Sequence, residues 1–247
     1  MSDASISTVV RTVNLAFSSD PLIQWLRPNA TPWSEQNPSA SKWQYRRVQS
    51  IMSHGQVFQS ASVAQMAQDY LKKPPMSEDE AAPEKKSRIS VSQDPDIHST
   101  DAGTVVFLYP PAGYLSWSLN RILLTCKVWL LELFNPALDE GCKEKRVDKL
   151  MAANRSSAQA LQKQYSKQKL WYLEVIAVHP ALQSRGLGGG VMRWILERVG
   201  EQPIYLECTA RDNVSFYEAF GFRVVEEVEL MDDDDGEKLF YWVMIRT

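Results

Sequence analysis

Apolar residues recur with helical spacing in the first quarter of the chain. This spacing predicts an amphipathic helix over residues 8–27 and a second helix over residues 41–53. Asp20-Pro21 falls inside the first pattern. Because proline lacks a backbone N–H and clashes with the preceding turn, we expect the helix to break there. Residues 56–71 fit a strand and a helix equally well, so their assignment stays open.

The pattern changes between residues 72 and 101, where prolines and charged residues accumulate without any apolar period. Such a composition cannot bury a hydrophobic face, so we expect a flexible, solvated insertion over residues 72–101. The apolar run at residues 104–109, closed by Pro110-Pro111, predicts a buried strand. A long helical region follows over residues 117–164, with a break near Asn135-Pro136.

The most apolar stretch of the chain lies inside this helical region, at residues 122–134. A helix needs roughly 20 apolar residues to cross a bilayer. This stretch is shorter and carries Lys127 and Glu132. We therefore expect a helix of the hydrophobic core here, and no membrane anchor.

The C-terminal third alternates between strand and helix patterns. The predicted order is strand, helix, strand, helix and two final strands, at residues 171–178, 186–199, 204–208, 213–220, 222–230 and 238–245. Strands that alternate with helices run parallel in one sheet, whereas the last two, joined by an acidic turn, form an antiparallel hairpin. The predicted fold class is therefore α/β, with a mixed sheet and a parallel pair at its centre.

Composition narrows the class of protein. With 247 residues, 44% apolar and 23% charged, residues 1–247 are expected to form a single elaborated domain. A formal net charge of −3 argues against nucleic acid as the main partner. No signal-peptide pattern is present, and three cysteines without disulfide or zinc spacing fit reduced thiols in a cytoplasmic protein. The three histidines are scattered, so no metal site is expected.

A glycine-rich segment, Gln183-Ser-Arg-Gly186-Leu-Gly188-Gly189-Gly190, lies between a predicted strand and a predicted helix. Glycines let a ligand approach the backbone closely, and the first turn of a helix offers unpaired N–H groups with positive potential. With Arg185 adding a cation, this segment predicts a pyrophosphate site. A P-loop would need Gly-Lys-Ser/Thr, which is missing. A dinucleotide site stays open because Glu207 lies near the end of the next strand.

Two motifs resemble landmarks of the GNAT superfamily of N-acetyltransferases. Gln183-Ser-Arg-Gly186-Leu-Gly188 is similar to its Gln/Arg-x-x-Gly-x-Gly/Ala signature, and Asn213-x-x-x-Tyr217-x-x-x-Gly221-Phe222 looks like its second landmark. Pro110-Pro111 after a strand also resembles an ending found in fungal members. The resemblance is specific over residues 170–225. It implies a GNAT-like fold in a single domain, with the acetyl-CoA-binding core in that range.

The resemblance further implies acetyl-CoA as the co-substrate. In the family, the strand before the glycine loop is splayed from the next strand, so that its backbone binds the pantetheine arm and thioester. The loop amides hold the pyrophosphate. The cofactor-binding residues expected on this basis, with Asn213 on the pantetheine arm, are Ile176, Ala177, Val178, Gln183, Ser184, Arg185, Gly186, Leu187, Gly188, Gly189 and Asn213.

Amide formation adds two catalytic candidates. An alkylamine has a pKa of roughly 10.4, so neutralising it at pH 7 costs about 4.6 kcal/mol and a general base is useful. Side chains alternate along a strand, so Glu174 is expected on the same face as Ile176 and Val178, facing the cofactor cleft. This makes Glu174 the candidate base, with a structural salt bridge as the alternative. Tyr217 matches the family tyrosine that protonates the leaving thiolate.

The resulting prediction is an N-acetyltransferase that moves an acetyl group from acetyl-CoA directly to an amine, with a small-molecule acceptor. The acidic turn at residues 232–235 is a weaker candidate for attracting a cationic acceptor. Two alternatives stay open, a nucleotide-dinucleotide-binding enzyme and a non-catalytic CoA-binding or interaction protein. The sequence identifies neither the acceptor nor the oligomeric state.

Overall fold

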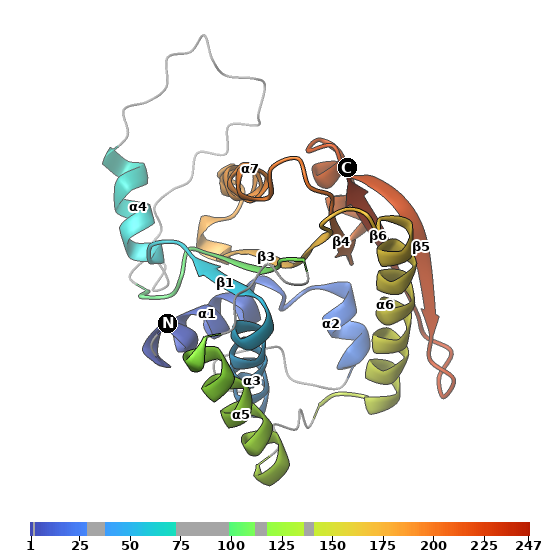
Figure 1. Ribbon diagram of the computed structural model, residues 1–247. Helices are drawn as coiled ribbons and strands as arrows, with labels where there is room; N and C mark the ends of the chain where they lie inside the picture. Colours follow the sequence, from blue (N-terminus) through green and yellow to red (C-terminus); the bar gives the residue numbers. More distant parts are fainter. Residues whose placement is uncertain (2, 29–37, 73–98, 112–117, 136–140) are drawn as a thin grey trace.

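The computed structural model describes residues 1, 3–28, 38–72, 99–111, 118–135 and 141–247 (Figure 1). The helices are α1 (Asp3–Ala16), α2 (Pro21–Leu26), α3 (Pro38–His54), α4 (Val63–Lys72), α5 (Leu119–Phe134), α6 (Glu144–Gln164), α7 (Leu187–Val199) and α8 (Val214–Glu218). The strands are β1 (Gln56–Gln59), β2 (Thr104–Tyr109), β3 (Trp171–Val178), β4 (Ile204–Cys208), β5 (Arg223–Met231) and β6 (Lys238–Arg246). Two short 3₁₀ turns, Pro180–Leu182 and Arg211–Asn213, follow β3 and β4.

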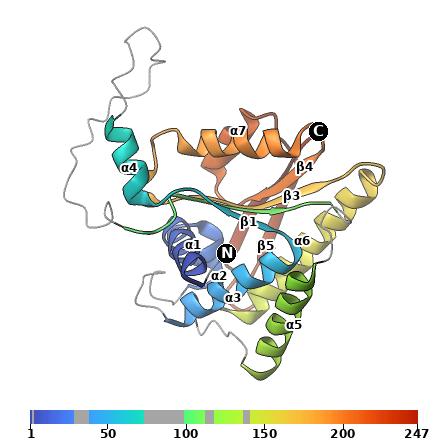
Figure 2. The same ribbon diagram turned by 60° about the vertical axis from the view of Figure 1, so that its left-hand side comes forward.

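The six strands form one sheet in the order β1-β2-β3-β4-β6-β5. Its neighbours pair antiparallel except β3 and β4 in the middle, which run parallel. The predicted mixed α/β sheet with a central parallel pair is therefore confirmed. Helix α7 covers one face of the sheet, and α1, α3 and α6 cover the other (Figures 1 and 2).

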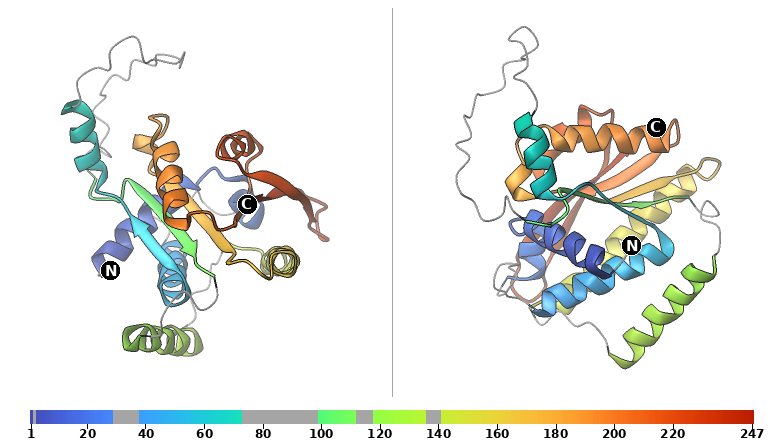
Figure 3. Two further views of the ribbon diagram at one scale, coloured as in Figure 1. Left: turned by 45° about the horizontal axis from the view of Figure 1, so that its top comes forward. Right: turned by 90° about the vertical axis from the view of Figure 1, so that its left-hand side faces the viewer.

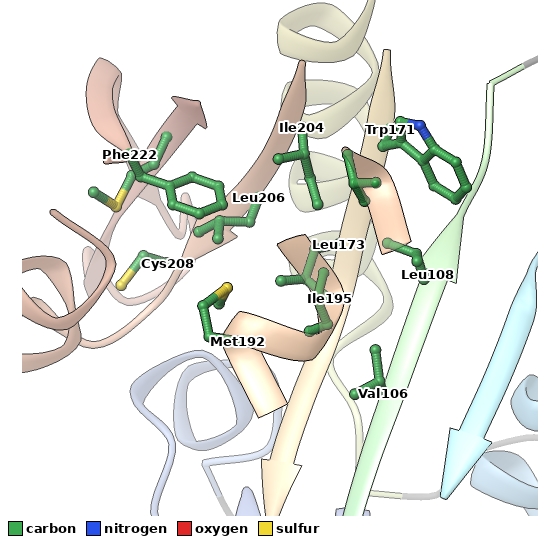
Figure 4. Packing of buried hydrophobic residues seen from close by; sticks show 12 residues of the cluster. Val106, Leu108, Trp171, Leu173, Met192, Ile195, Ile204, Leu206, Cys208 and Phe222 are labelled. Carbon is green, nitrogen blue, oxygen red and sulfur yellow. The ribbon is translucent and has the colours of Figure 1, made fainter. Parts of the chain in front are cut away.

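The α7 face of the sheet carries a compact apolar core. Met192 and Ile195 project from α7 and are fully buried against Leu173 on β3 and Leu206 on β4 (Figure 4). Burying a side chain of this size contributes about 1.5–3 kcal/mol. This packing fixes the start of α7, and with it the glycine-rich segment, next to the middle of the sheet.

The opposite face is divided between two sets of helices. Near β2 and β3, α1 and α3 bury one cluster that includes Val9, Val48 and Phe107. Towards β6 and β5, α2 and α6 bury a second cluster that includes Trp25 and Tyr241. The two clusters thus divide this face of the sheet between a β2–β3 side and a β6–β5 side.

A β-bulge interrupts β3 at Glu174. Leu173 pairs with Leu108 and Val175 pairs with Phe107, so Glu174 is an extra residue opposite β2. Before the bulge, Leu173 faces α7; after it, Ile176 faces α7 and Val175 faces α1 and α3.

Glu174 itself points to α3, where it pairs with Arg47. The prediction that strict alternation places Glu174 and Ile176 on one face is therefore wrong. An inserted residue shifts the period of two by one position, which reverses the facing of every side chain that follows.

The N-terminal predictions are largely confirmed. The first helical pattern divides at Asp20, whose carboxylate accepts hydrogen bonds from the Leu22 and Ile23 amides and so caps α2. The ambiguous residues 56–71 contain both a strand, β1, and a helix, α4. Most of the predicted insertion at 72–101 falls on residues 73–98, which lie outside the described residues.

The apolar stretch at residues 122–134 does not belong to the core. It forms most of α5, which packs on the outer side of α3 and has no buried residue (Figure 3). Leu123, Trp129 and Phe134 are among its exposed side chains. The expectation of a core helix is wrong because α5 contacts another helix rather than the sheet. No helix in the described part of the chain combines the length and hydropathy needed to span a membrane.

Candidate functional site

The central feature of the site is a fork between β3 and β4. These strands pair only from Trp171 with Ile204 to Leu173 with Leu206. Residues 174–178 of β3 continue along β2 but have no strand partner on the β4 side. The backbone of Ile176, Ala177 and Val178 thus borders an opening in the sheet, as the resemblance implied.

The glycine-rich segment begins where β3 ends. His179 is fully buried and caps the 3₁₀ turn, and the Gln183 side-chain amide donates to the Val178 carbonyl oxygen at 3.0 Å. Ser184 and Gly186 adopt left-handed backbone conformations, with φ of 59° and 73°. Glycine takes that conformation without steric cost, so Gly186 starts α7 at this point.

The amide groups of this segment are directed away from the sheet ladder. The first intrahelical hydrogen bond of α7 runs from the Gly190 N–H to the Gly186 carbonyl, at 3.2 Å. The N–H groups of Ser184 and of residues 186–189 make no hydrogen bond to the backbone of the described residues. No acidic residue occupies the first turn and no side chain caps the helix. The start of α7 therefore has the positive potential and free donors of an anion site.

Helix α8 packs beside this helix start. A Cβ atom added at Gly188 would lie 3.7 Å from the Phe216 ring, and one at Gly189 would lie 3.6 Å from the Phe220 ring. Tyr217 follows Phe216 in the chain. Its ring packs edge-to-face against the rings of Phe216 and Phe222, at 5.2 and 5.9 Å between ring centroids. Asn213 is exposed at the beginning of α8.

Tyr217 lies on the inner side of α8, near the end of β4. Burial raises the pKa of its hydroxyl, and the neighbouring Cys208 and Asp20 raise it further. The hydroxyl is thus held in its protonated form at neutral pH, which is the form that can donate a proton. Nearby, Thr209 donates to the Asp20 carboxylate at 2.6 Å and joins the end of β4 to the start of α2.

Glu174 occupies the β3 arm of the fork. One carboxylate oxygen, Oε1, accepts from Arg47 of α3 through both Nε, at 3.1 Å, and Nη2. The other oxygen, Oε2, is buried and has no hydrogen-bond partner among the described residues. Burial and the charge of Glu174 together raise the pKa of Tyr109 above its usual range. The structural ion pair considered for Glu174 is thus present, and its role as a base stays a prediction.

Glu207 occupies the β4 arm. Continuing the β3–β4 register by one residue sets Glu207 opposite Glu174, at the position where pairing stops. Burial raises the pKa of Glu207 to about 7, with a smaller upward contribution from the charge of Glu174. Hydrogen bonding with the Tyr172 side chain acts in the opposite direction on this pKa and favours the charged carboxylate.

Three tyrosines line the sheet below the fork. Tyr172 stacks on Tyr109 at 5.6 Å and on Tyr205 at 4.7 Å, from three neighbouring strands. Tyr172 thus connects the aromatic side chains of β2 and β4 across β3. The pairing of Glu207 with Glu174 could not be predicted from the sequence, because the parallel register is set by contacts between residues distant in the chain.

The acidic turn after β5 is bound to α6. Asp232 and Asp235 pair with Arg146 and Lys143, Asp234 with Lys145, and Asp233 with Lys149. These ion pairs hold the turn against α6, so its carboxylates are not a free anionic patch for an acceptor. Among the described residues, no group of three or more His, Cys, Asp or Glu side chains is arranged to hold a metal ion.

Comparison with known proteins agrees with this geometry. Residues 147–224 match the family model described as an acetyltransferase (GNAT) domain. Arylalkylamine N-acetyltransferase 2 from Aedes aegypti is similar over 100% of this chain and 96% of that chain, with 13% identity and a TM-score of 0.53. A Corynebacterium glutamicum structure described as histone acetyltransferase HPA2 and related acetyltransferase is similar over 100% of this chain and 92% of its own, with 15% identity and a TM-score of 0.49.

Proposed function

Because this chain carries an acetyltransferase domain of the GNAT family, we propose that it transfers an acetyl group from acetyl-CoA directly to a small-molecule amine. The family assignment makes it an enzyme; the acceptor and the roles of individual residues are the proposal. The observation that carries it is the fork between β3 and β4, which opens directly beside the amide-rich start of α7.

The two features suit the two ends of acetyl-CoA. The free N–H groups of Ser184 and of residues 186–189, together with the cationic side chain of Arg185, suit the diphosphate. The unpaired edge of β3 at Ile176, Ala177 and Val178 suits the amides of the pantetheine arm, since an extended chain can pair there as an added strand.

The neighbouring side chains have different parts in this assignment. Asn213, at the start of α8, would bind the pantetheine arm. Gln183 acts indirectly, because its amide fixes the Val178 carbonyl.

The chemistry requires a neutral amine and a protonated leaving group. The amine nitrogen forms a bond to the thioester carbon, the carbon–sulfur bond breaks, and the sulfur leaves as a thiolate that needs a proton. Tyr217, held protonated near the end of β4, would supply that proton. Glu174, on the face of the sheet opposite α7, supplies negative charge where an ammonium would enter.

The acceptor class follows from the carboxylates and tyrosines at the fork. A protonated alkylamine would be attracted by Glu174 and Glu207 and would contact the rings of Tyr109 and Tyr172. The Aedes aegypti structure, which shares this fold over the whole chain, is named for arylalkylamine acetylation, and that name motivates testing aromatic alkylamines first.

Two measurements test the proposal. Acetyl-CoA is expected to raise the melting temperature of the chain, whereas NAD is not. In a thiol-release assay with acetyl-CoA, at least one acceptor among 2-phenylethylamine, agmatine, spermidine, lysine and a lysine peptide is expected to accelerate CoA formation. Protection by NAD alone would favour a dinucleotide-binding enzyme. Protection by CoA without turnover would favour a non-catalytic CoA-binding protein.

A further inference from the structure

Two glutamates lie where the central strands separate. Glu174 and Glu207 are the first residues of β3 and β4 beyond the last paired position, Leu173 with Leu206. We propose that Glu207 receives the proton of the acceptor ammonium, that Tyr172 positions the Glu207 carboxylate, and that Glu174 binds the acceptor without taking its proton. This inference rests on the proposed acetyl transfer and deepens it.

Glu174 already has a cationic partner, Arg47. Its guanidinium binds Oε1 of Glu174 through two nitrogens, and the side chains of Arg47 and Glu174 are only 27% and 17% exposed. A proton on Glu174 would neutralise that carboxylate and leave the Arg47 cation largely buried without its counter-charge. Such a separation is costly, because the charge has already lost most of its hydration.

The surroundings of Glu207 differ in charge from those of Glu174. No ion pair joins it to a cation within the described part of the chain. The titratable groups that face it are Tyr172 and Glu174 on β3, Tyr205 on its own strand and Tyr241 on β6. None of these is cationic, so a proton on Glu207 removes a buried negative charge instead of exposing a positive one. Burial raises the pKa of Glu207 to about 7, a value suited to exchanging protons at neutral pH.

The charges balance through one turnover. Glu174 and Arg47 cancel, so an ionised Glu207 leaves the fork with one negative charge, which a monocationic amine neutralises. Glu207 takes one proton from the ammonium, and the nitrogen lone pair then forms the new carbon–nitrogen bond as the carbon–sulfur bond breaks. Tyr217 protonates the thiolate and regains a proton through solvent from the second N–H. Glu207 releases its proton to water after the products leave.

The test compares pH profiles of kcat/KM, with acetyl-CoA as donor and the best acceptor of the panel above. Glu207→Gln is expected to lower kcat/KM at least 100-fold and to abolish the acid limb near pH 7, with acetyl-CoA affinity retained. Glu229→Gln, at an exposed glutamate of β5 paired with Lys238, is the matched control and is expected to keep the parent profile.

Two further variants test the assignment independently of Glu207→Gln. Tyr172→Phe removes a hydrogen bond that favours the charged carboxylate, so the acid limb should move to higher pH. Glu174→Gln removes a negative charge that disfavours the charged form of Glu207, so the acid limb should move to lower pH. A merely structural role for these residues would lower activity without opposite shifts. If Glu207→Gln does not fold, as judged by thermal unfolding, the directions of these two shifts test the role of Glu207.

The proposal is overturned if Glu207→Gln keeps kcat/KM within threefold of the parent value with its acid limb intact. It is also overturned if the acid limb is lost only in Glu174→Gln, or if neither Tyr172→Phe nor Glu174→Gln moves it in the stated direction. Absence of turnover in the parent chain with every acceptor would instead reject acetyl transfer itself. That failure is seen before any variant is compared.

Discussion

Glu174 and Val175 are consecutive on β3, yet both point to the face of the sheet covered by α1 and α3. Glu174 pairs with Arg47 of α3, and Val175 packs in the cluster that contains Val48 and Phe107. The bulge opposite β2 is the cause. It turns the Glu174 carboxylate towards a helix at the same position where β3 separates from β4, so a single inserted residue sets both the ion pair and the edge of the fork.

The Arg47–Glu174 ion pair is expected to stabilise the fold as well as orient the carboxylate. Arg47→Met should lower the free energy of unfolding more in the parent background than in Glu174→Gln, with a coupling of about 1–3 kcal/mol for two largely buried partners. The measurement is a double-mutant cycle by urea unfolding at pH 7. Strict additivity of the two single variants would show that the pair contributes nothing to stability.

The start of α7 is expected to bind the diphosphate through its amides. Gly188→Asp should weaken acetyl-CoA binding at least tenfold, because it places a negative charge among free N–H groups. Gly190→Asp is the control: the Gly190 N–H already bonds to the Gly186 carbonyl, and an added Cβ there meets nothing within 4 Å. Calorimetric titration with acetyl-CoA compares the two. Equal weakening by both variants would contradict an amide site at residues 186–189.

Much of the fold could be predicted because its signals are local. The apolar run of β2, the strand–helix alternation from β3 to α8 and the acidic hairpin turn each depend on a few neighbouring residues. The placement of α5 could not be predicted in the same way. Its hydrophobic residues are typical of a core helix, but burial depends on which element the helix contacts, and α5 contacts the outer side of α3.

The residues of the site also differ in whether their signals are local in the sequence. The glycine-rich segment and Tyr217 belong to continuous motifs, so their positions beside the fork could be anticipated. The facing of Glu174 depends on a bulge that only pairing with β2 reveals. From the sequence, Glu207 is identified only as a residue near a strand end. Its place opposite Glu174 follows from a parallel register between segments about 30 residues apart.

Tyr217 is expected to act on the leaving thiolate. Tyr217→Phe keeps the ring that packs against Phe216 and Phe222, so the fold and acetyl-CoA affinity should be retained. Loss of the hydroxyl should lower kcat by roughly 10²-fold, within the range of a general-acid contribution. Tyr165→Phe, at a half-buried tyrosine whose hydroxyl accepts from Arg223, is the control and should keep the parent kcat. An unchanged kcat in Tyr217→Phe would remove this residue from the chemistry.

The ion pairs between α6 and the turn after β5 predict a pH-dependent stability. Asp232 is 3% exposed, accepts from the Asp234 amide at 3.0 Å and binds Arg146. These contacts hold the pKa of Asp232 well below its usual range. A lowered folded-state pKa stabilises the protein above the unfolded value of about 4, and this stabilisation is lost as the pH falls towards the folded value.

Asp232→Asn should therefore lower the melting temperature at pH 7 by on the order of 5 °C. The difference from the parent chain should narrow as the pH is lowered from 5 to 3, because acid removes the same charge from the parent. Asp233→Asn, at a side chain that is 69% exposed and paired with Lys149, should change the melting temperature little at any pH. Thermal unfolding across this pH range measures both. The difference in melting temperature between Asp232→Asn and the parent could instead stay constant with pH. That result would show that Asp232 stabilises the fold through its packing and not through its negative charge.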